Sequence, residues 1–317
     1  MTGTKVIIDC DAGIDDALAL IILIAAHKQE KIQIKAITCV NGNTSVDNVV
    51  KNVFRTLNVC KIPVFQGAYA PLLCIKNAVQ DYYHGNDGFG DAYDTKIDTS
   101  KLEQEHAVYA LNKIVSEYPN EVNVLCMGPL TNIALVVKMY PKFMDNVKEF
   151  YIMGGNTTAQ GNITSQAEFN FYMDPESVHI NNNKKRLWLL PWETCLKSRI
   201  SHEWRRDILG QMDKPCIQLM NDIEYACQKK RKKQFPTYIM CDAILAGILL
   251  RPEIAQNVVS YHADVELNGN RTRGQVVLDH LLSNEPNVLL IQDFDSEIFK
   301  ELLIFSVNNL DNNTINI

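Results

Sequence analysis

The hydrophobic positions fall into short apolar runs, each followed by a turn and then by a helical pattern. Residues 6–8 form the first run, and a long apolar segment that continues to Ala26 follows a glycine-containing turn. A second run, residues 32–40, ends in an Asn-Gly-Asn turn and precedes a helical pattern over residues 45–57. Strands and helices that alternate in this way predict a parallel sheet.

The same alternation continues along the chain and predicts an α/β fold with a mostly parallel sheet flanked by helices. We find no internal repeat, low-complexity segment or linker, so residues 1–317 are expected to form one domain. Further strands are predicted at 63–67, 122–127, 150–153 and 187–193, helices at 104–118, 131–137, 244–250 and 296–307, and two or three strands in the tail that begins at Val258.

Composition narrows the class of protein. The 31 basic and 37 acidic residues give a net charge of −6, which argues against nucleic acid as a partner because phosphate binding needs a basic face. No apolar run is long enough for a transmembrane helix. We expect no signal peptide, because residues 1–5 lead directly into the first strand. The nine cysteines lack CxxC spacing, so we expect reduced thiols and a cytoplasmic protein rather than a disulfide framework or a zinc site.

Four carboxylates crowd the end of the first predicted strand and the start of the first helix: Asp9, Asp11, Asp15 and Asp16. In open α/β sheets ligands bind at this edge. Acids so close repel one another unless a positive group joins them. An N-cap and the helix dipole account for one or two of them, but not for those at the end of a buried strand. A hard cation with oxygen ligands is the simplest explanation.

Other strand ends carry further candidates for the same site. Asn41 ends the second strand level with Asp11, although Asn-Gly is also an ordinary turn. Met127 ends another strand, where its carbonyl can point at a metal. Asp242 precedes an apolar helix, and the first interpretation is that it is the N-cap of this helix. Cys241 beside it is interpreted as a small buried hydrophobic residue.

A second polar stretch lies near the middle of the chain. If it is extended, Glu168 and Asn170 project together, while Phe169 and Phe171 point into packing. A carboxylate and an amide side by side suit a sugar diol or hydroxymethyl group, and a half-buried edge strand is the alternative. Asp174 is expected to be structural, as the N-cap of the next helix.

Three more features have weaker functional meaning. The glycine- and aspartate-rich stretch 81–91, which contains His84, predicts a mobile surface loop of the kind that forms lids. Trp188 is expected in the core, whereas Trp192 either packs at a rim or stacks on a planar ligand. The basic run 229–233 resembles a nuclear-import or nucleic-acid patch, but in an acidic chain we expect a solvated helix end.

Taken together, these motifs resemble those of the inosine-uridine preferring nucleoside hydrolases. Residues 9–17 match the DxDxGxDDA motif, and the matches run in family order to residue 279, so they cover nearly the whole chain. The other matching motifs are His84-Gly85 with Asp87-Gly88, Gly128-Pro129-Leu130-Thr131-Asn132-Ile133-Ala134, Met153-Gly154-Gly155, Glu168-Phe169-Asn170 with Asp174-Pro175, and Arg273-Gly274 with Asp279.

The resemblance implies a Rossmann-like fold, a homodimer or homotetramer, and hydrolysis of the N-glycosidic bond of ribonucleosides. Asp11 would take a proton from a water on a bound Ca²⁺. Asp9 would hold the metal ligands in place without binding the metal itself. The implied Ca²⁺ ligands are Asp11, Asp16, the carbonyl of Met127 and Asp242. The implied ribose contacts are Asp15, Asn41, Asn162, Glu168 and Asn170.

One position departs from the pattern of many family members. They have His directly before the last metal Asp, where it is thought to help the base leave, and here Cys241 resembles a cysteine-bearing branch. A thiol can donate a proton, but it matches neutral pH less well than His. His84, Tyr82 and Tyr83 are alternative donors, and Trp192 is a candidate for stacking on a purine. The choice between purine and pyrimidine nucleosides stays open.

Two other functions compete with this one. Asp9-Cys10-Asp11 resembles the DxD nucleophile of haloacid-dehalogenase-type phosphatases, but that family lacks the Asp15-Asp16 pair and prefers Mg²⁺. Cys241 alone suggests a catalytically silent nucleoside-binding protein. The hydrolase hypothesis and the binding-protein hypothesis both imply a small ribonucleoside as partner, and neither involves nucleic acid or a membrane.

Overall fold

The structure, a computed structural model, has eight strands in one central sheet. It describes residues 3–57, 61–74, 83–181, 187–229 and 235–310. The strands of the sheet are β1 (Thr4–Cys10), β2 (Ile32–Cys39), β3 (Val64–Gln66), β4 (Val122–Cys126), β5 (Glu149–Met153), β6 (Leu187–Leu190), β7 (Ala255–Tyr261) and β10 (Val288–Phe294). A separate antiparallel pair consists of β8 (Ala263–Val265) and β9 (Val276–Leu278).

The strand order is β3-β2-β1-β4-β5-β6-β10-β7, and every neighbouring pair is parallel except β10 and β7. This confirms the predicted mostly parallel α/β fold. Strand β1 is buried on both faces: Ile8 packs into one core cluster and Ile7 into the cluster on the opposite face. The chain order reverses between β1 and β4, so the end of β1 lies at the point where open α/β sheets bind ligands.

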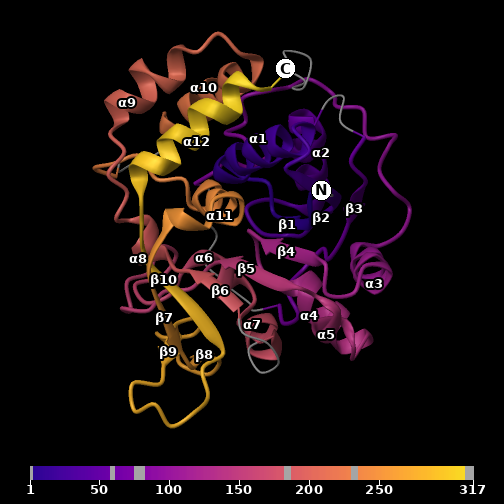
Figure 1. Ribbon diagram of the computed structural model, residues 1–317, viewed down its shortest axis with the longest axis vertical. Coiled ribbons are helices and arrows are strands. Elements are labelled where there is room, and N and C mark those ends of the chain that lie inside the picture. The colour runs from indigo at the N-terminus through magenta and orange to yellow at the C-terminus, as the bar shows by residue number, and fades with distance from the viewer. Residues whose placement is uncertain (1–2, 58–60, 75–82, 182–186, 230–234, 311–317) are drawn as a thin grey trace.

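Helices cover both faces of the sheet (Figure 1). Helices α1, α2, α10, α11 and α12 pack with one core cluster, and α3, α4, α5 and α7 with the other. No helix in the described ranges is long and apolar enough to cross a membrane. The helices are α1 (Ile14–Lys28), α2 (Val46–Leu57), α3 (Ala107–Glu117), α4 (Thr131–Met139), α5 (Phe143–Asn146), α6 (Phe169–Met173), α7 (Pro175–Asn181), α8 (Trp192–Cys195), α9 (His202–Asp207), α10 (Pro215–Gln228), α11 (Cys241–Leu250) and α12 (Ser296–Asn308), with 3₁₀ turns at Leu209–Gln211 and Pro252–Ile254.

Most predicted elements are found within a few residues of their expected bounds, but the tail differs. It has four strands, β7 to β10, rather than two or three, because the short arm β8–β9 leaves the main sheet.

Trp188 is only partly buried, and it stacks on Tyr151 with ring centroids 5.8 Å apart. Asp174 caps α7 as predicted: its Oδ1 accepts the backbone N–H of Ser177 at 3.2 Å.

Two predicted features fall partly outside the described residues. Of the basic run, residues 230–233 lie outside, and the ammonium group of Lys229 lies 4.1 Å from the ring centroid of Tyr225. Of the predicted loop, residues 81–82, including Tyr82, also lie outside.

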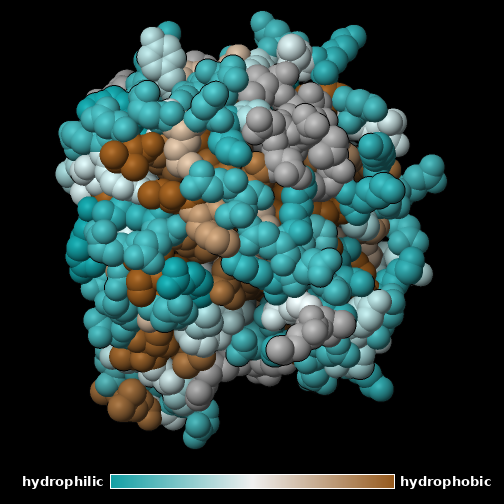
Figure 2. All heavy atoms as spheres, turned by 45° about the horizontal axis from the view of Figure 1, so that its top comes forward, coloured by the Kyte–Doolittle hydropathy of each residue, from teal (hydrophilic) through white to brown (hydrophobic). Residues whose placement is uncertain are grey.

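The surface is mostly hydrophilic on the face that Figure 2 shows, with hydrophobic atoms gathered at its lower left. The arm β8–β9 projects at this end of the molecule (Figure 1). Leu281 and Leu282, which follow the arm, are 88% and 74% exposed, and Val277 on β9 is 50% exposed.

Candidate active site

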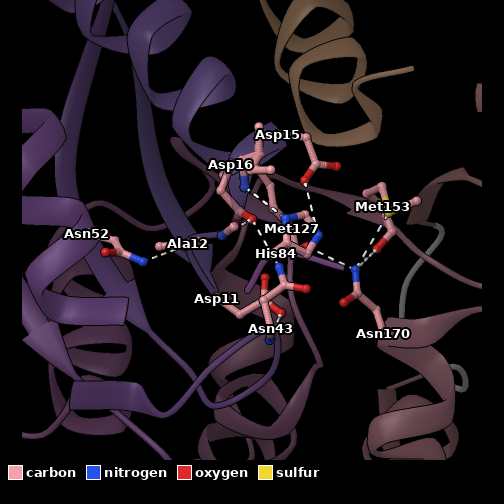
Figure 3. A network of polar contacts seen from close by, with 12 residues as sticks. Asp11, Ala12, Asp15, Asp16, Asn43, Asn52, His84, Met127, Met153 and Asn170 are labelled. Carbon is pink, nitrogen blue, oxygen red and sulfur yellow. Dashed lines mark hydrogen bonds and ion pairs between the residues drawn. The ribbon is translucent and has the colours of Figure 1, made fainter. Parts of the chain in front are cut away.

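A tight turn after β1 brings the acids to the carboxyl edge of the sheet. Ala12 adopts a left-handed backbone with φ of 37°, and its carbonyl accepts a hydrogen bond from Asn52 Nδ2 at 3.0 Å (Figure 3). Gly42, in the turn after β2, approaches so closely that a Cβ there would lie 2.1 Å from Asp11 Oδ2. Only glycine leaves room at this position, so the second turn packs directly against Asp11.

Three buried carboxylates, those of Asp11, Asp16 and Asp242, each keep one oxygen without a hydrogen-bond partner among the described residues, as does Asp9 behind them. Asp11 and Asp16 have no exposed surface, and Asp242 is 3% exposed. In all three the Oδ1 atom lacks a partner. The second oxygen of Asp11 accepts the N–H of Asn43 at 2.8 Å, and that of Asp16 accepts the N–H of Gly13 at 2.8 Å. Buried carboxylate oxygens without partners are costly unless a cation joins them.

The electrostatics of this cluster favour binding of a cation. Burial raises the pKa of Asp16 to about 8, with a further contribution from Asp15. Burial, and then the neighbouring carboxylates, also raise the pKa values of Asp11 and Asp242. Carboxylate oxygens of Asp15, Asp16 and Asp242 lie within 4.8 Å of one another. These residues therefore fit a hard divalent cation, which prefers oxygen ligands.

The carbonyl of Met127 lies directly after β4, at the expected strand end. It accepts a hydrogen bond from Asn170 Nδ2 at 2.9 Å, and the same amide reaches the carbonyl of Met153 at 3.2 Å (Figure 3). Asn170 thus ties the ends of β4 and β5 together. All three residues line the same cavity, in which the carbonyl of Met127 can add a neutral oxygen to the carboxylates.

The expectation of an extended segment at Glu168 is wrong. Glu168 is the N-cap of α6, and its carboxylate accepts the backbone N–H of Asn170 at 2.9 Å and of Phe171 at 3.1 Å. These bonds start a helix where alternating polar and aromatic residues suggested a strand. Phe171 packs in the core as predicted, but Phe169 lines the cavity beside Glu168 and Asn170.

The cavity has a volume of about 940 Å³, within the usual range for small-molecule sites. Asp15 and Asn162 line it, whereas Asn41 is not among the described residues that do. The Asn41 amide instead donates to the carbonyl of Thr44 at 3.4 Å. Asn43, which the sequence did not single out, lines the cavity in its place.

His84 reaches the start of α1 from the predicted loop. Its Nδ1 accepts the backbone N–H of Ile14 at 3.0 Å, and its Nε2 lies 3.9 Å from Asp15 Oδ1 (Figure 3). Tyr83 and His84 both line the cavity, so the described part of this loop does form one of its walls.

Cys241 and Asp242 open helix α11. The cap position is Met240, with no side-chain cap hydrogen bond, so the N-cap interpretation of Asp242 is wrong. Cys241 is 5% exposed, lines the cavity and is hydrogen-bonded with Cys195. Burial, and then this hydrogen bond, raise the pKa of the Cys241 thiol well above its usual value.

Trp192 packs at the edge of the cavity, which is one of the two alternatives predicted for it. It opens the short helix α8, is 7% exposed and packs edge-to-face on Phe235, with ring centroids 5.5 Å apart. Both aromatic rings also line the cavity, where they can contact a planar ligand.

Asp9 lies behind the cluster, in contact with one residue near the end of β2 and one at the start of α4. Its Oδ1 accepts hydrogen bonds from Thr38 Oγ1 at 2.5 Å and from Asn132 Nδ2 at 2.8 Å. The same Asn132 amide also donates to the carbonyl of Cys39 at 3.1 Å. Asn132 belongs to one of the matching sequence motifs but was not predicted as a site residue. Its contact with Asp9 joins residues 123 positions apart, which the sequence pattern does not reveal.

Comparison with known proteins agrees with this geometry. A family profile described as "Inosine-uridine preferring nucleoside hydrolase" matches residues 6–301. The chain is 31% identical to the "Inosine-uridine preferring nucleoside hydrolase" of Leishmania major, over 92% of this chain and 94% of that protein. It is 32% identical to the "Pyrimidine-specific ribonucleoside hydrolase RihA" of Salmonella paratyphi B, over 94% and 96%.

A solved structure named "Inosine-Guanosine Nucleoside Hydrolase (IG-NH)" superimposes with a TM-score of 0.88 at 27% identity, covering 97% of this chain and 99% of that one. Family profile, relatives and fold all agree on hydrolysis of the N-glycosyl bond of nucleosides. The chain therefore belongs to the inosine-uridine preferring nucleoside hydrolase family.

Proposed function

We propose that the protein is a Ca²⁺-dependent ribonucleoside hydrolase that releases ribose and a free base. The observation that carries this proposal is the set of three buried carboxylates whose Oδ1 atoms have no hydrogen-bond partner among the described residues. Of the three, Asp242 lines the cavity, whereas Asp11 and Asp16 are not among the described residues that do. Calcium takes six to eight oxygens, so protein, substrate and water can share it. The proposed protein ligands are Asp11, Asp16, Asp242 and the carbonyl of Met127.

When bound, Ca²⁺ would supply positive charge that makes a water easier to deprotonate. Asp11 would accept the proton of the attacking water as general base. Attack at the anomeric carbon passes through an oxocarbenium-like state, as in other glycoside hydrolysis. The carboxylate of Glu168, which backbone N–H groups hold at the cavity wall, would stabilise the positive charge that develops on the ribose.

The ribose is proposed to contact Asp15, Asn162, Glu168 and Asn170, which all line the cavity. Asn41 would have to leave its hydrogen bond with Thr44 to join this set. Asn43 already faces the cavity, and we infer that it takes the role predicted for Asn41.

The leaving base is proposed to lie toward Cys241 and Trp192. The Cys241 thiol lines the cavity beside Asp242, where it can donate its proton to the base. The names of the relatives cover inosine, guanosine, uridine and pyrimidine nucleosides. We therefore propose activity on both purine and pyrimidine ribonucleosides.

The test is ribose release from inosine, guanosine, uridine and cytidine, with added Ca²⁺ and with a chelator. We expect release that the chelator abolishes and that Ca²⁺ restores. Release that persists after complete metal removal would refute the metal dependence. Calorimetric binding of nucleosides without turnover would instead favour the silent binding protein. The family membership gives no support to the phosphatase alternative.

We also propose that the protein forms a homodimer or homotetramer. The exposed apolar side chains of Leu281, Leu282 and Val277 support it, since exposed apolar patches commonly mark contact surfaces. Light scattering coupled to gel filtration tests it, and a monomeric mass at micromolar concentration would refute it.

A further inference from the structure

The imidazole of His84 is held between a helix start and a carboxylate. Its Nδ1 accepts the N–H of Ile14, the first residue of α1, at 3.0 Å. The Nε2 atom of His84 lies 3.9 Å from Oδ1 of Asp15, which is the residue after Ile14. The ring therefore bridges the backbone of one residue and the side chain of the next, at the wall of the cavity.

The Ile14 contact dictates which nitrogen carries the proton. A nitrogen that accepts a hydrogen bond uses its lone pair and carries no proton, so the N–H of a neutral ring must be on the other nitrogen. A proton on Nδ1 would oppose the N–H of Ile14 within the hydrogen-bond distance of 3.0 Å.

We propose that His84 is a positioning residue with a fixed tautomer: Nδ1 is held by the Ile14 N–H, and the Nε2–H orients the Asp15 carboxylate toward the nucleoside. This inference rests on the proposed function, in which Asp15 contacts the ribose. A small closure of the 3.9 Å separation on substrate binding brings Nε2 and Asp15 Oδ1 into hydrogen-bond range.

The same geometry excludes His84 as the acid that protonates the leaving base. A neutral ring that gave up its Nε2 proton would become an imidazolate anion beside Asp15 and near the acidic cluster. His84 was one of the predicted proton donors, and this inference removes it from that role. Cys241 and Tyr83, which both line the cavity, are left among the described candidates.

Nitrogen-15 NMR of the Ca²⁺-loaded protein, labelled at its seven histidines, tests the tautomer directly. The spectrum of His84→Gln identifies the His84 signals. We expect an unprotonated Nδ1 and a protonated Nε2 near neutral pH. A cationic ring or a protonated Nδ1 would overturn the proposal. This measurement needs no turnover, so it separates failure of the inference from failure of the proposed hydrolase activity.

Kinetics of two variants test the positioning role. In His84→Gln an amide can take the place of Nε2 and donate to Asp15, whereas the shorter His84→Asn can only accept from Ile14. We expect kcat/KM to fall roughly tenfold in His84→Asn, as for one hydrogen bond to a charged group, with a smaller loss in His84→Gln. Equal loss in both variants would overturn the role of the Nε2–H.

A substrate with a good leaving group separates positioning from acid catalysis. The phenolate of 4-nitrophenyl β-D-ribofuranoside departs without a proton from the enzyme. Loss of ribose positioning lowers its hydrolysis by the same factor as that of inosine. A His84→Asn variant that lost activity on inosine but kept it on the nitrophenyl riboside would show that His84 is the acid, and would refute the proposal.

Discussion

Asn43 holds two carboxylates of the site at once: its backbone N–H donates to Asp11 Oδ2 at 2.8 Å, and its side-chain amide to Asp16 Oδ2 at 3.4 Å. The other oxygen of each carboxylate, Oδ1, is buried without a hydrogen bond among the described residues. One oxygen of each acid is thus fixed by the protein, while the other stays available to a cation.

Replacement of Asn43 by Ala should weaken the metal site without removing a ligand. The variant keeps the backbone bond to Asp11 but loses the amide bond to Asp16. Loss of such an outer contact typically lowers metal affinity roughly 10–100-fold. Calorimetric titration with Ca²⁺ measures this change. Asn48→Ala is the matched control, because Asn48 bonds to Thr44 rather than to a carboxylate of the cluster. Equal Ca²⁺ affinity in the two variants would contradict the assignment.

Asp11→Asn should separate catalysis from stability. As the proposed general base, Asp11 contributes about 10²–10⁴-fold to the rate, so kcat should fall by that order. In the presence of a chelator the same variant should melt at a higher temperature than the wild type, because it loses a buried carboxylate oxygen, Oδ1, that has no hydrogen-bond partner among the described residues. Activity assays and melting curves measure the two effects. A variant that lost activity and also melted lower under chelation would indicate damaged folding instead.

The first strand, turn and helix could be predicted from sequence because each is specified locally. Apolar residues on both faces of β1 require a central strand, and the acids directly after it have few alternatives to a cation. The position of the Met127 carbonyl could also be predicted, because Met127 directly follows a strand and the end of that strand fixes where the carbonyl lies. Parallel strands bring their carboxyl ends to one edge whatever the loops between them do.

What the sequence did not reveal depends on orientation within turns and on long-range contacts. Asn41 and Asn43 are chemically identical and two residues apart, and only the shape of the turn decides which amide faces the cavity. At Glu168, a short segment with alternating aromatic residues fits a strand as well as a helix, and the cap hydrogen bonds decide between them. The bond between Asn132 and Asp9 joins residues with no local relation.

Cys241→Ala should affect natural nucleosides more than activated substrates. If the thiol protonates the leaving base, its loss should lower kcat on inosine by roughly 10²-fold, at the lower end of general acid catalysis, and leave 4-nitrophenyl β-D-ribofuranoside almost unaffected. Cys195→Ala, which removes the hydrogen-bond partner of Cys241, is the control for packing in this region. Full activity of Cys241→Ala on inosine would show that the cysteine has no role as an acid.

Stability of the metal-free protein should decrease as the pH rises from acid to neutral. Burial raises the pKa of Asp9 and Glu168 to about 7 and that of Asp16 to about 8, from ordinary values of 3.8 for Asp and 4.5 for Glu. The folded state therefore binds these protons more tightly than the unfolded state does. Their contribution to the free energy of unfolding is complete below about pH 4 and is lost as the pH rises through 7 and 8.

Calcium should reverse this trend, because a bound cation replaces the protons that the cluster otherwise retains. Melting temperatures between pH 5 and 8.5, with a chelator and with excess Ca²⁺, measure both curves. We expect the Ca²⁺-induced increase in melting temperature to grow with pH. An Asp11→Asn, Asp16→Asn double variant is the control, and its two curves should lie close together. A wild-type protein whose chelated form became more stable toward pH 8 would contradict the raised pKa values of this cluster and its role as a cation site.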